Sequence, residues 1–155
     1  MEYAVGRCGR IIAARLFEGE QLYESIESIA EKEKIKSAAV LITGGIRKAE
    51  VVVGPRTETP KIEPEFLSFT GPGEVLGVGT IYCDEEDKPK LHLHAGIGKG
   101  DKPIVGCPRG REGMPYGSGA SIFLILEVTI IEIAGIAGKR ETDPVSGFKL
   151  LRIKK

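Results

Sequence analysis

The sequence predicts one α+β domain, a mostly antiparallel β-sheet with one main amphipathic helix packed on it. A single segment has helical periodicity: between Leu22 and Ala30 apolar residues recur on one helical face, and Glu and Lys fill the other positions through Lys34. The rest of the chain alternates between runs rich in β-branched residues and turns rich in Gly and Pro. Strands joined by hairpins around one helix are typical of the α+β class, and 155 residues fit a single domain over residues 1–155.

The expected elements follow the chain in order. A first strand, Arg10–Leu16, leads through a turn at residues 18–20 into the helix. A second strand, Ser37–Thr43, is almost wholly apolar, so we expect it to lie in the middle of the sheet. The remaining expected strands are residues 49–53, 65–69, 74–82, 91–95, 121–133 and 148–153.

Three segments are expected to be irregular or to form loops. Gly54–Pro64 contains three prolines and is long for a loop of a compact domain, which suggests a surface or interface role. Residues 96–119 contain eight of the 21 glycines, which indicates irregular backbone or a close approach to another segment. Gly135–Gly147 is the third.

Composition excludes some function classes and favours a cytoplasmic protein. Lys plus Arg and Asp plus Glu both number 22, so bulk positive charge for binding nucleic acid is absent. Three cysteines, an odd number without a C-x-x-C motif, favour a reducing compartment. We expect no signal peptide, and the most apolar stretch, Ile122–Ile133, is too short and too charged to span a membrane.

The only two histidines form the motif His92-Leu93-His94 on an expected strand. Alternate strand residues point to the same face, so both imidazoles could reach one divalent ion. Cys107 is the preferred third ligand, and Cys83 on the neighbouring strand is a rival. Two imidazoles and a thiolate suit zinc, although another divalent metal is possible. The alternative is a pair of solvated or hydrogen-bonded side chains.

Two further features are candidates for function. Glu127 shares a face of its strand with apolar residues and is a candidate general base; alternatively, this face is partly exposed or an Arg pairs with it. Arg109 and Arg111, in Pro108-Arg109-Gly110-Arg111, resemble the core of an AT-hook that enters the DNA minor groove, but Glu112 follows where a hook has proline. A basic loop is the alternative.

Several segments occur in an order that characterises a known family. They are Phe17–Glu20 before the helix, Ser37–Ile46, Phe66–Gly71, His92–Ala95, Gly98 with Asp101, Val105-Gly106 and Glu127-Val128. Between about Arg10 and Ile133 the chain therefore resembles the plants-and-prokaryotes conserved domain, the PPC family.

The resemblance implies a compact α+β fold and a homotrimer. Plant members carry AT-hooks upstream of the domain and act as nuclear DNA-binding regulators; this chain is similar to the stand-alone prokaryotic form, whose biochemical activity is not established. The family usually has Gly-His in the region of Gly106, where Cys107 and Pro108 stand here. If that histidine is a metal ligand, Cys107 either replaces it or weakens the site.

Three hypotheses follow. The first is a homotrimer that binds a divalent metal, zinc, at His92, His94 and Cys107. This hypothesis leaves open whether the protein is an enzyme and which small molecule it binds. The second is a DNA-associated or partner-binding regulatory trimer without catalysis, for which Arg109, Arg111 and the Lys154-Lys155 end provide positive charge. The third is an oligomeric scaffold without a site.

Overall fold

The structure, a computed structural model, describes residues 1–58, 62–110 and 119–154. The elements in chain order are β1 (Arg7–Phe17), α1 (Leu22–Lys32), β2 (Ser37–Thr57), β3 (Glu63–Cys83), β4 (Pro89–Lys99), β5 (Lys102–Gly106), β6 (Ala120–Ala134), β7 (Ala137–Thr142) and β8 (Lys149–Lys154). A mostly antiparallel sheet accompanied by one helix among these residues agrees with the expected α+β class.

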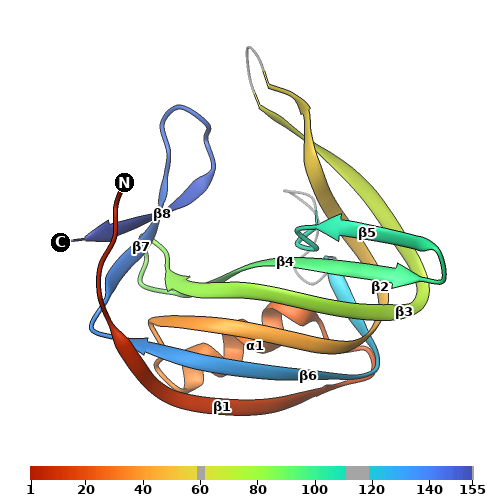
Figure 1. Ribbon diagram of the computed structural model, residues 1–155, viewed down its shortest axis with the longest axis horizontal. Coiled ribbons are helices and arrows are strands. Elements are labelled where there is room, and N and C mark those ends of the chain that lie inside the picture. The colour runs from red at the N-terminus through yellow and green to blue at the C-terminus, as the bar shows by residue number, and fades with distance from the viewer. Residues whose placement is uncertain (59–61, 111–118, 155) are drawn as a thin grey trace.

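The sheet has the strand order β1-β6-β2-β3-β4-β5, and every neighbouring pair along it is antiparallel (Figure 1). β2 lies between β6 and β3, as its apolar sequence predicted. β7 meets β3 in a parallel arrangement at the pair Cys83 and Lys139, and β8 pairs with β7. The β7–β8 hairpin therefore lies at one end of the sheet, next to the start of β4.

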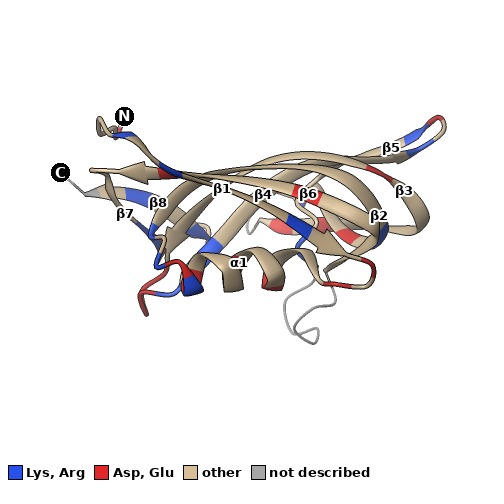
Figure 2. Ribbon diagram, turned by 90° about the horizontal axis from the view of Figure 1, so that it is seen from below, with Lys and Arg blue, Asp and Glu red and all other residues tan. Residues whose placement is uncertain are grey.

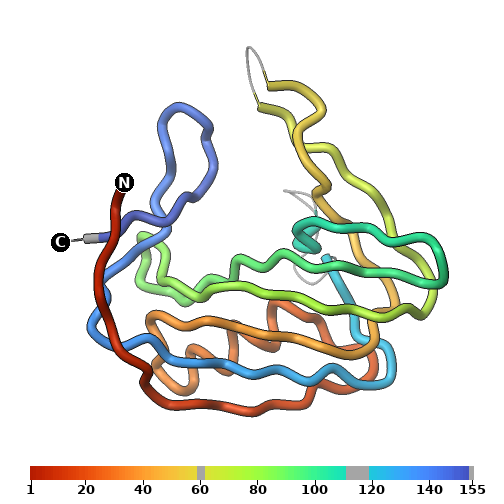
Figure 3. Tube along the Cα trace, viewed as in Figure 1, coloured from red at the N-terminus to blue at the C-terminus, as the bar shows by residue number. Residues whose placement is uncertain are grey.

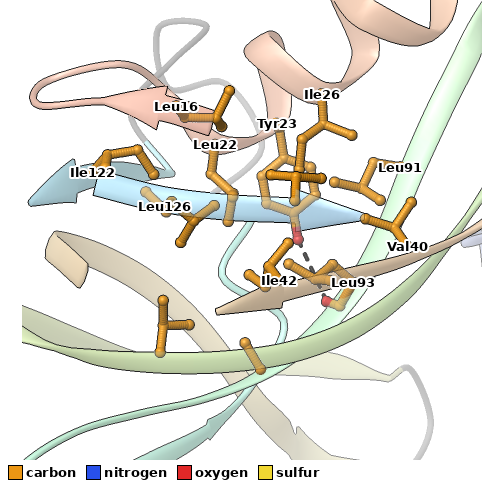
Figure 4. Close-up of a cluster of buried hydrophobic side chains, with 14 of the residues drawn as sticks. Leu16, Leu22, Tyr23, Ile26, Val40, Ile42, Leu91, Leu93, Ile122 and Leu126 are labelled. Carbon is orange, nitrogen blue, oxygen red and sulfur yellow. Dashed lines mark hydrogen bonds between the residues drawn. The ribbon is translucent and has the colours of Figure 1, made fainter. Parts of the chain in front are cut away.

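The helix lies beneath one face of the sheet (Figure 2). Leu22, Ile26 and Ala30 are fully buried in the core, together with strand residues such as Val40 and Leu126 (Figure 4). Each large aliphatic side chain buried in this way contributes about 2 kcal/mol through removal of apolar surface from water. These buried side chains hold α1 against the inner face of the sheet.

The opposite face of the sheet exposes large apolar side chains. Side chains alternate between the two faces along a strand, so the residues directly before and after a buried residue point away from α1. Among them are Ile11, Leu41, Leu76, Val78 and Val105, which are between 44% and 70% exposed. We call these five residues the outer apolar face. Contiguous exposed apolar surface of this kind is typical of an association surface.

The predicted loops at Gly54–Pro64 and Gly135–Gly147 are wrong in part. β2 continues to Thr57 and β3 begins at Glu63, so the first segment is mainly the end of a long hairpin that projects beyond the sheet (Figure 3). Pro55 pairs with Pro64 there, and among the described residues no third strand pairs with this part of the hairpin, a setting that tolerates proline. The second segment contains β7. Likewise, the two strands expected at residues 65–69 and 74–82 are parts of one strand, β3.

The glycine-rich segment contains strand and one close backbone approach. Cys107, directly after β5, exchanges two backbone hydrogen bonds of 2.9 Å with Val52 in the outer half of β2. A Cβ atom on Gly106 would lie only 2.0 Å from the Val52 carbonyl oxygen, so this contact requires glycine. The sheet therefore curls until β5 meets β2. No helix among the described residues is long and apolar enough to cross a membrane.

Candidate functional site

His92 and His94 lie side by side on β4, on the face of the sheet opposite α1. The intervening and flanking residues, Leu91, Leu93 and Ala95, are buried in the core, whereas both histidines are exposed. Their Nε2 atoms are 3.2 Å apart, and the rings are inclined at 66° with centroids 5.1 Å apart. The two imidazoles therefore converge on one point, as the His-x-His spacing predicted.

This separation fits two ligands of one metal ion. Zinc binds histidine nitrogen at about 2.0–2.1 Å, and two nitrogens on a tetrahedral ion are then about 3.3 Å apart. Without an ion, the same contact is a hydrogen bond in which one imidazole donates and the other accepts. The pair can thus hold a divalent cation with little change in position.

The surroundings keep His92 neutral. Although His92 is exposed to solvent on one side, the partial burial of its ring lowers its pKa to about 4, and the positive charge of Arg140, His94 and Arg109 acts in the same direction. A metal-binding imidazole must be deprotonated, so His92 is prepared for a cation at neutral pH without the cost of releasing a proton.

Cys107 lies at the edge of β4 and its sulfur faces the helix. Its Sγ is 3.5 Å from the hydroxyl of Tyr23, which also donates to the Leu93 carbonyl at 3.4 Å (Figure 4). Burial is the main cause of the raised pKa of Tyr23, so this phenol stays protonated. The described residues contain no group of three or more His, Cys, Asp or Glu side chains that could hold a metal ion. Within one chain, the structure brings the two imidazoles together and directs Cys107 to Tyr23.

The rival ligand and the candidate base lie elsewhere. Cys83 is buried, with its sulfur 3.9 Å from the Lys36 carbonyl, and by strand alternation it points to the face opposite His92. Glu127 is exposed on the outer face of β6, opposite Arg15 of β1. Three strand spacings, about 14 Å, separate β6 from β4, so Glu127 does not reach the histidine pair of its own chain.

The side chain of Arg109 is hydrogen-bonded at the edge of β4. It donates to the Glu27 carboxylate at 3.0 Å and to the Leu91 carbonyl at 3.1 Å, and its guanidinium lies over the ring of Tyr23. These contacts give Arg109 a structural role next to the histidines. Arg111, the other arginine of the hook-like segment, lies outside the described residues.

Sequence reasoning missed two neighbours of the histidine pair, Arg140 and Thr80. Thr80 of β3 pairs with His92, and its hydroxyl accepts a hydrogen bond of 2.9 Å from Arg140 of β7. The sequence predicts a loop at Gly135–Gly147, which includes Arg140, whereas the residue lies on β7. A signal was present: the Asp143–Gly147 turn before the last strand indicates a hairpin, whose other strand must precede residue 143.

The model of a known protein family matches most of the chain. The model of the Plants and Prokaryotes Conserved (PCC) domain matches residues 3–116. No curated protein matched the chain.

Solved structures share the fold over nearly the whole chain. A metal-containing protein from Archaeoglobus fulgidus has a TM-score of 0.79 at 22% identity, covering 98% of this chain and 99% of its own. A plant- and prokaryote-conserved (PPC) protein from Pyrococcus horikoshii also has a TM-score of 0.79, at 21% identity, covering 100% and 99%. A proposed DNA-binding protein from Bacteroides thetaiotaomicron has a TM-score of 0.73 at 14% identity, covering 97% and 99%.

Proposed function

Because the chain belongs to the Plants and Prokaryotes Conserved (PCC) domain family, we propose that it is a homotrimer that binds a divalent metal ion, zinc, at His92 and His94. The observation that carries the proposal is the 3.2 Å separation of the two Nε2 atoms on an exposed face. That one solved relative is named a metal-containing protein supports it further.

We expect a third ligand to complete the coordination shell of the metal ion. Cys107 is the candidate within the chain, since it follows β5 beside the β4 edge and its thiolate would favour zinc over harder cations. Its sulfur would have to leave the Tyr23 hydroxyl to reach the imidazoles. The alternative is a donor from a neighbouring subunit, since both imidazoles lie on the outer face.

The outer apolar face supports assembly into an oligomer. Val78 pairs with His94 across β3 and β4, and Leu41 pairs with Val78 across β2 and β3, so the apolar surface begins beside the histidines. Covering side chains as exposed as Leu76 and Val78 is favourable by about 25 cal/mol for each Å² removed from water. In such a trimer, the metal site lies at or near the subunit contact.

A zinc ion at this pair would act as a Lewis acid on a bound water or carbonyl oxygen if a coordination position stays open. The chain's own contribution is to hold the imidazoles: β4 orients both rings on one face, and the neutral state of His92 keeps its nitrogen available. Glu127 acts as a base at this site only if it belongs to another subunit.

Metal analysis tests the proposal directly. Protein purified without a histidine tag, loaded with zinc and freed of excess metal, should carry about one zinc per chain by mass spectrometry. His92→Ala combined with His94→Ala should lose it. Wild type that retains no near-stoichiometric metal would refute the site, and metal retained by the double variant would place the ion elsewhere.

The alternative function, a DNA-associated or partner-binding trimer without catalysis, draws support from relatives named as proposed DNA-binding proteins. Against it, the formal net charge is zero and the donors of Arg109 are directed to Glu27 and Leu91. Gel shifts with A·T-rich and mixed duplexes at about 0.15 M salt decide between them. Submicromolar binding that Arg109→Ala with Arg111→Ala abolishes would favour the alternative.

A further inference from the structure

Arg140 is a buried arginine next to the histidine pair. Its side chain donates from Nη2 to the Thr80 hydroxyl at 2.9 Å and carbonyl at 3.1 Å, and from Nε to the Lys90 carbonyl at 3.4 Å. The guanidinium therefore lies over the β3–β4 strand pair. Because Thr80 and His92 are directly paired, their side chains share one face, and Arg140 lies on that same face.

The charge of Arg140 is not balanced by a nearby carboxylate. The residue is only 4% exposed, yet the described residues place no Asp or Glu within ion-pair distance of it, and its hydrogen-bond acceptors are neutral oxygens. Burial lowers the pKa of Arg140, and the second cause is another cation, Arg109. A buried cation is costly without an anionic partner, and the ring of Tyr82, centred 5.9 Å away, offsets this only in part.

The surrounding charges do not supply the anion either. Glu27, the nearby carboxylate, already accepts from Lys90 at 3.2 Å and from Arg109 at 3.0 Å. Three cations, Lys90, Arg109 and Arg140, lie around Glu27 at the start of β4, while Glu85 and Asp87 of the preceding hairpin pair with Lys149 and Lys139. The metal ion proposed at the histidines would add two positive charges. The region attracts negative charge.

Donor groups remain available at this point. No described residue accepts a hydrogen bond from Nη1 of Arg140, and this nitrogen is not fully enclosed. The Thr80 oxygen accepts from Arg140, so its own O–H is free to donate. Both donors lie beside His92.

We propose that Arg140 and Thr80 form the binding site for a small oxyanion, a carboxylate or phosphate group, that also contacts the metal ion at His92 and His94. Arg140 supplies charge and the N–H donors of Nη1, and Thr80 supplies its O–H, so the two residues can bind two oxygens of one anion. The hairpin that carries Arg140 lies beyond the residues 3–116 that match the family model, so this contact need not be common to the family. The inference rests on the proposed function for the ion that forms the anion's second contact, whereas the contacts to Arg140 and Thr80 are independent of metal.

NMR of the full-length protein tests the site. The arginine side-chain Nε–H resonances are followed during titration with inorganic phosphate and, separately, with acetate, in zinc-loaded and in chelator-treated protein. The Arg140 signal should shift with at least one anion, with higher affinity when zinc is bound. The better of the two probes identifies the ligand as a phosphate or a carboxylate. Arg140→Gln should lower the affinity, measured here from the backbone amide signals of Thr80 and His92, about tenfold or more, the expected effect of losing a charge-assisted hydrogen bond.

Two further variants keep the result interpretable. Thr80→Val keeps the shape of the side chain and removes the hydroxyl, so affinity should fall several-fold even if Arg140→Gln fails to fold. Arg152→Gln, at a half-exposed arginine on β8 that pairs with Asp143, should leave the affinity unchanged. Zinc content is measured on each sample.

The outcomes separate the two proposals. Stoichiometric zinc without a shift of Arg140 by either anion would overturn this inference and leave the metal site intact. Anion binding that depends on Arg140 in protein that takes up no zinc would support the anion site and refute the metal site. Equal affinity in wild type and Thr80→Val, or in wild type and folded Arg140→Gln, would also overturn the inference.

Discussion

The carboxylate of Glu27 on α1 accepts a hydrogen bond of 2.9 Å from the backbone N–H of Leu91 on β4. The same carboxylate pairs with Lys90 and Arg109, and its side chain is only 7% exposed. The helix thereby holds the strand at the residue directly before His92. A buried charged acceptor with three partners is worth more than a surface pair.

Replacing Glu27 by Gln should therefore destabilise the protein by about 2 kcal/mol, because the charge that satisfies three donors is lost. Urea unfolding followed by circular dichroism measures the change. Glu33→Gln is the matched control, since Glu33 pairs with Arg10 at an exposed position and should cost less than about 0.5 kcal/mol. Equal effects of the two variants would contradict the structural role of Glu27.

Acid should destabilise the metal-free protein through His92. The folded pKa is about 4, against about 6.5 in the unfolded chain, so between these values the unfolded state binds more protons. The free energy of unfolding therefore decreases as the pH falls from about 6.5 to 4. Because the ring is half exposed, screening reduces the full shift to about 1 kcal/mol. Unfolding in a chelator at several pH values measures this slope, which His92→Gln should remove. An unchanged slope would show that other groups cause it.

Cobalt can report whether Cys107 is a ligand. Co²⁺ takes the same ligands as zinc, and a thiolate ligand produces a charge-transfer band in the near ultraviolet. We expect this band in wild type and its loss in Cys107→Ser, together with weaker zinc binding. Cys8→Ser is the control, since Cys8 is an exposed thiol on β1. Bound cobalt without the band would exclude Cys107 and favour a ligand from a neighbouring subunit.

Charge on the outer apolar face should dissociate the trimer. Val78 is 61% exposed beside His94, and burial of a Glu there in a subunit contact would cost several kcal/mol. Light scattering should give three times 16.7 kDa for wild type and a smaller mass for Val78→Glu. Val145→Glu, at a 94% exposed residue of the β7–β8 turn, should stay trimeric. A wild-type monomer at micromolar concentration would refute the trimer.

The local features of the fold could be predicted from the sequence. The helix from Leu22 has a clear 3.6-residue period, and the observed strands β1, β6 and β8 begin and end within three residues of the expected ones. The loop predictions fail in part because proline and glycine do not always end a strand. Pro55 and Pro64 face each other in a hairpin to which no third strand of the described chain pairs, so neither costs a ladder hydrogen bond to such a strand.

The histidine pair could be predicted, but its neighbours could not. Spacing of two along a strand fixes the relation between His92 and His94, whatever the rest of the fold. The contact of Arg140 with Thr80 depends on β7 reaching the end of β3, which joins residues 60 positions apart. Likewise, only the curl that joins Val52 to Cys107 directs that sulfur to the helix.

The pairing of β1 with β6 governs when this protein can fold. Arg7 pairs with Ala134 and Phe17 with Ile125, so β1 leaves the ribosome before β2 to β5 and has no partner in the sheet until β6 has been made. Loop closure on this scale slows folding and leaves an apolar strand edge exposed in the meantime. A nascent chain of this protein should therefore depend on holding factors such as chaperones until β6 emerges, and truncation before residue 125 should yield an aggregating product.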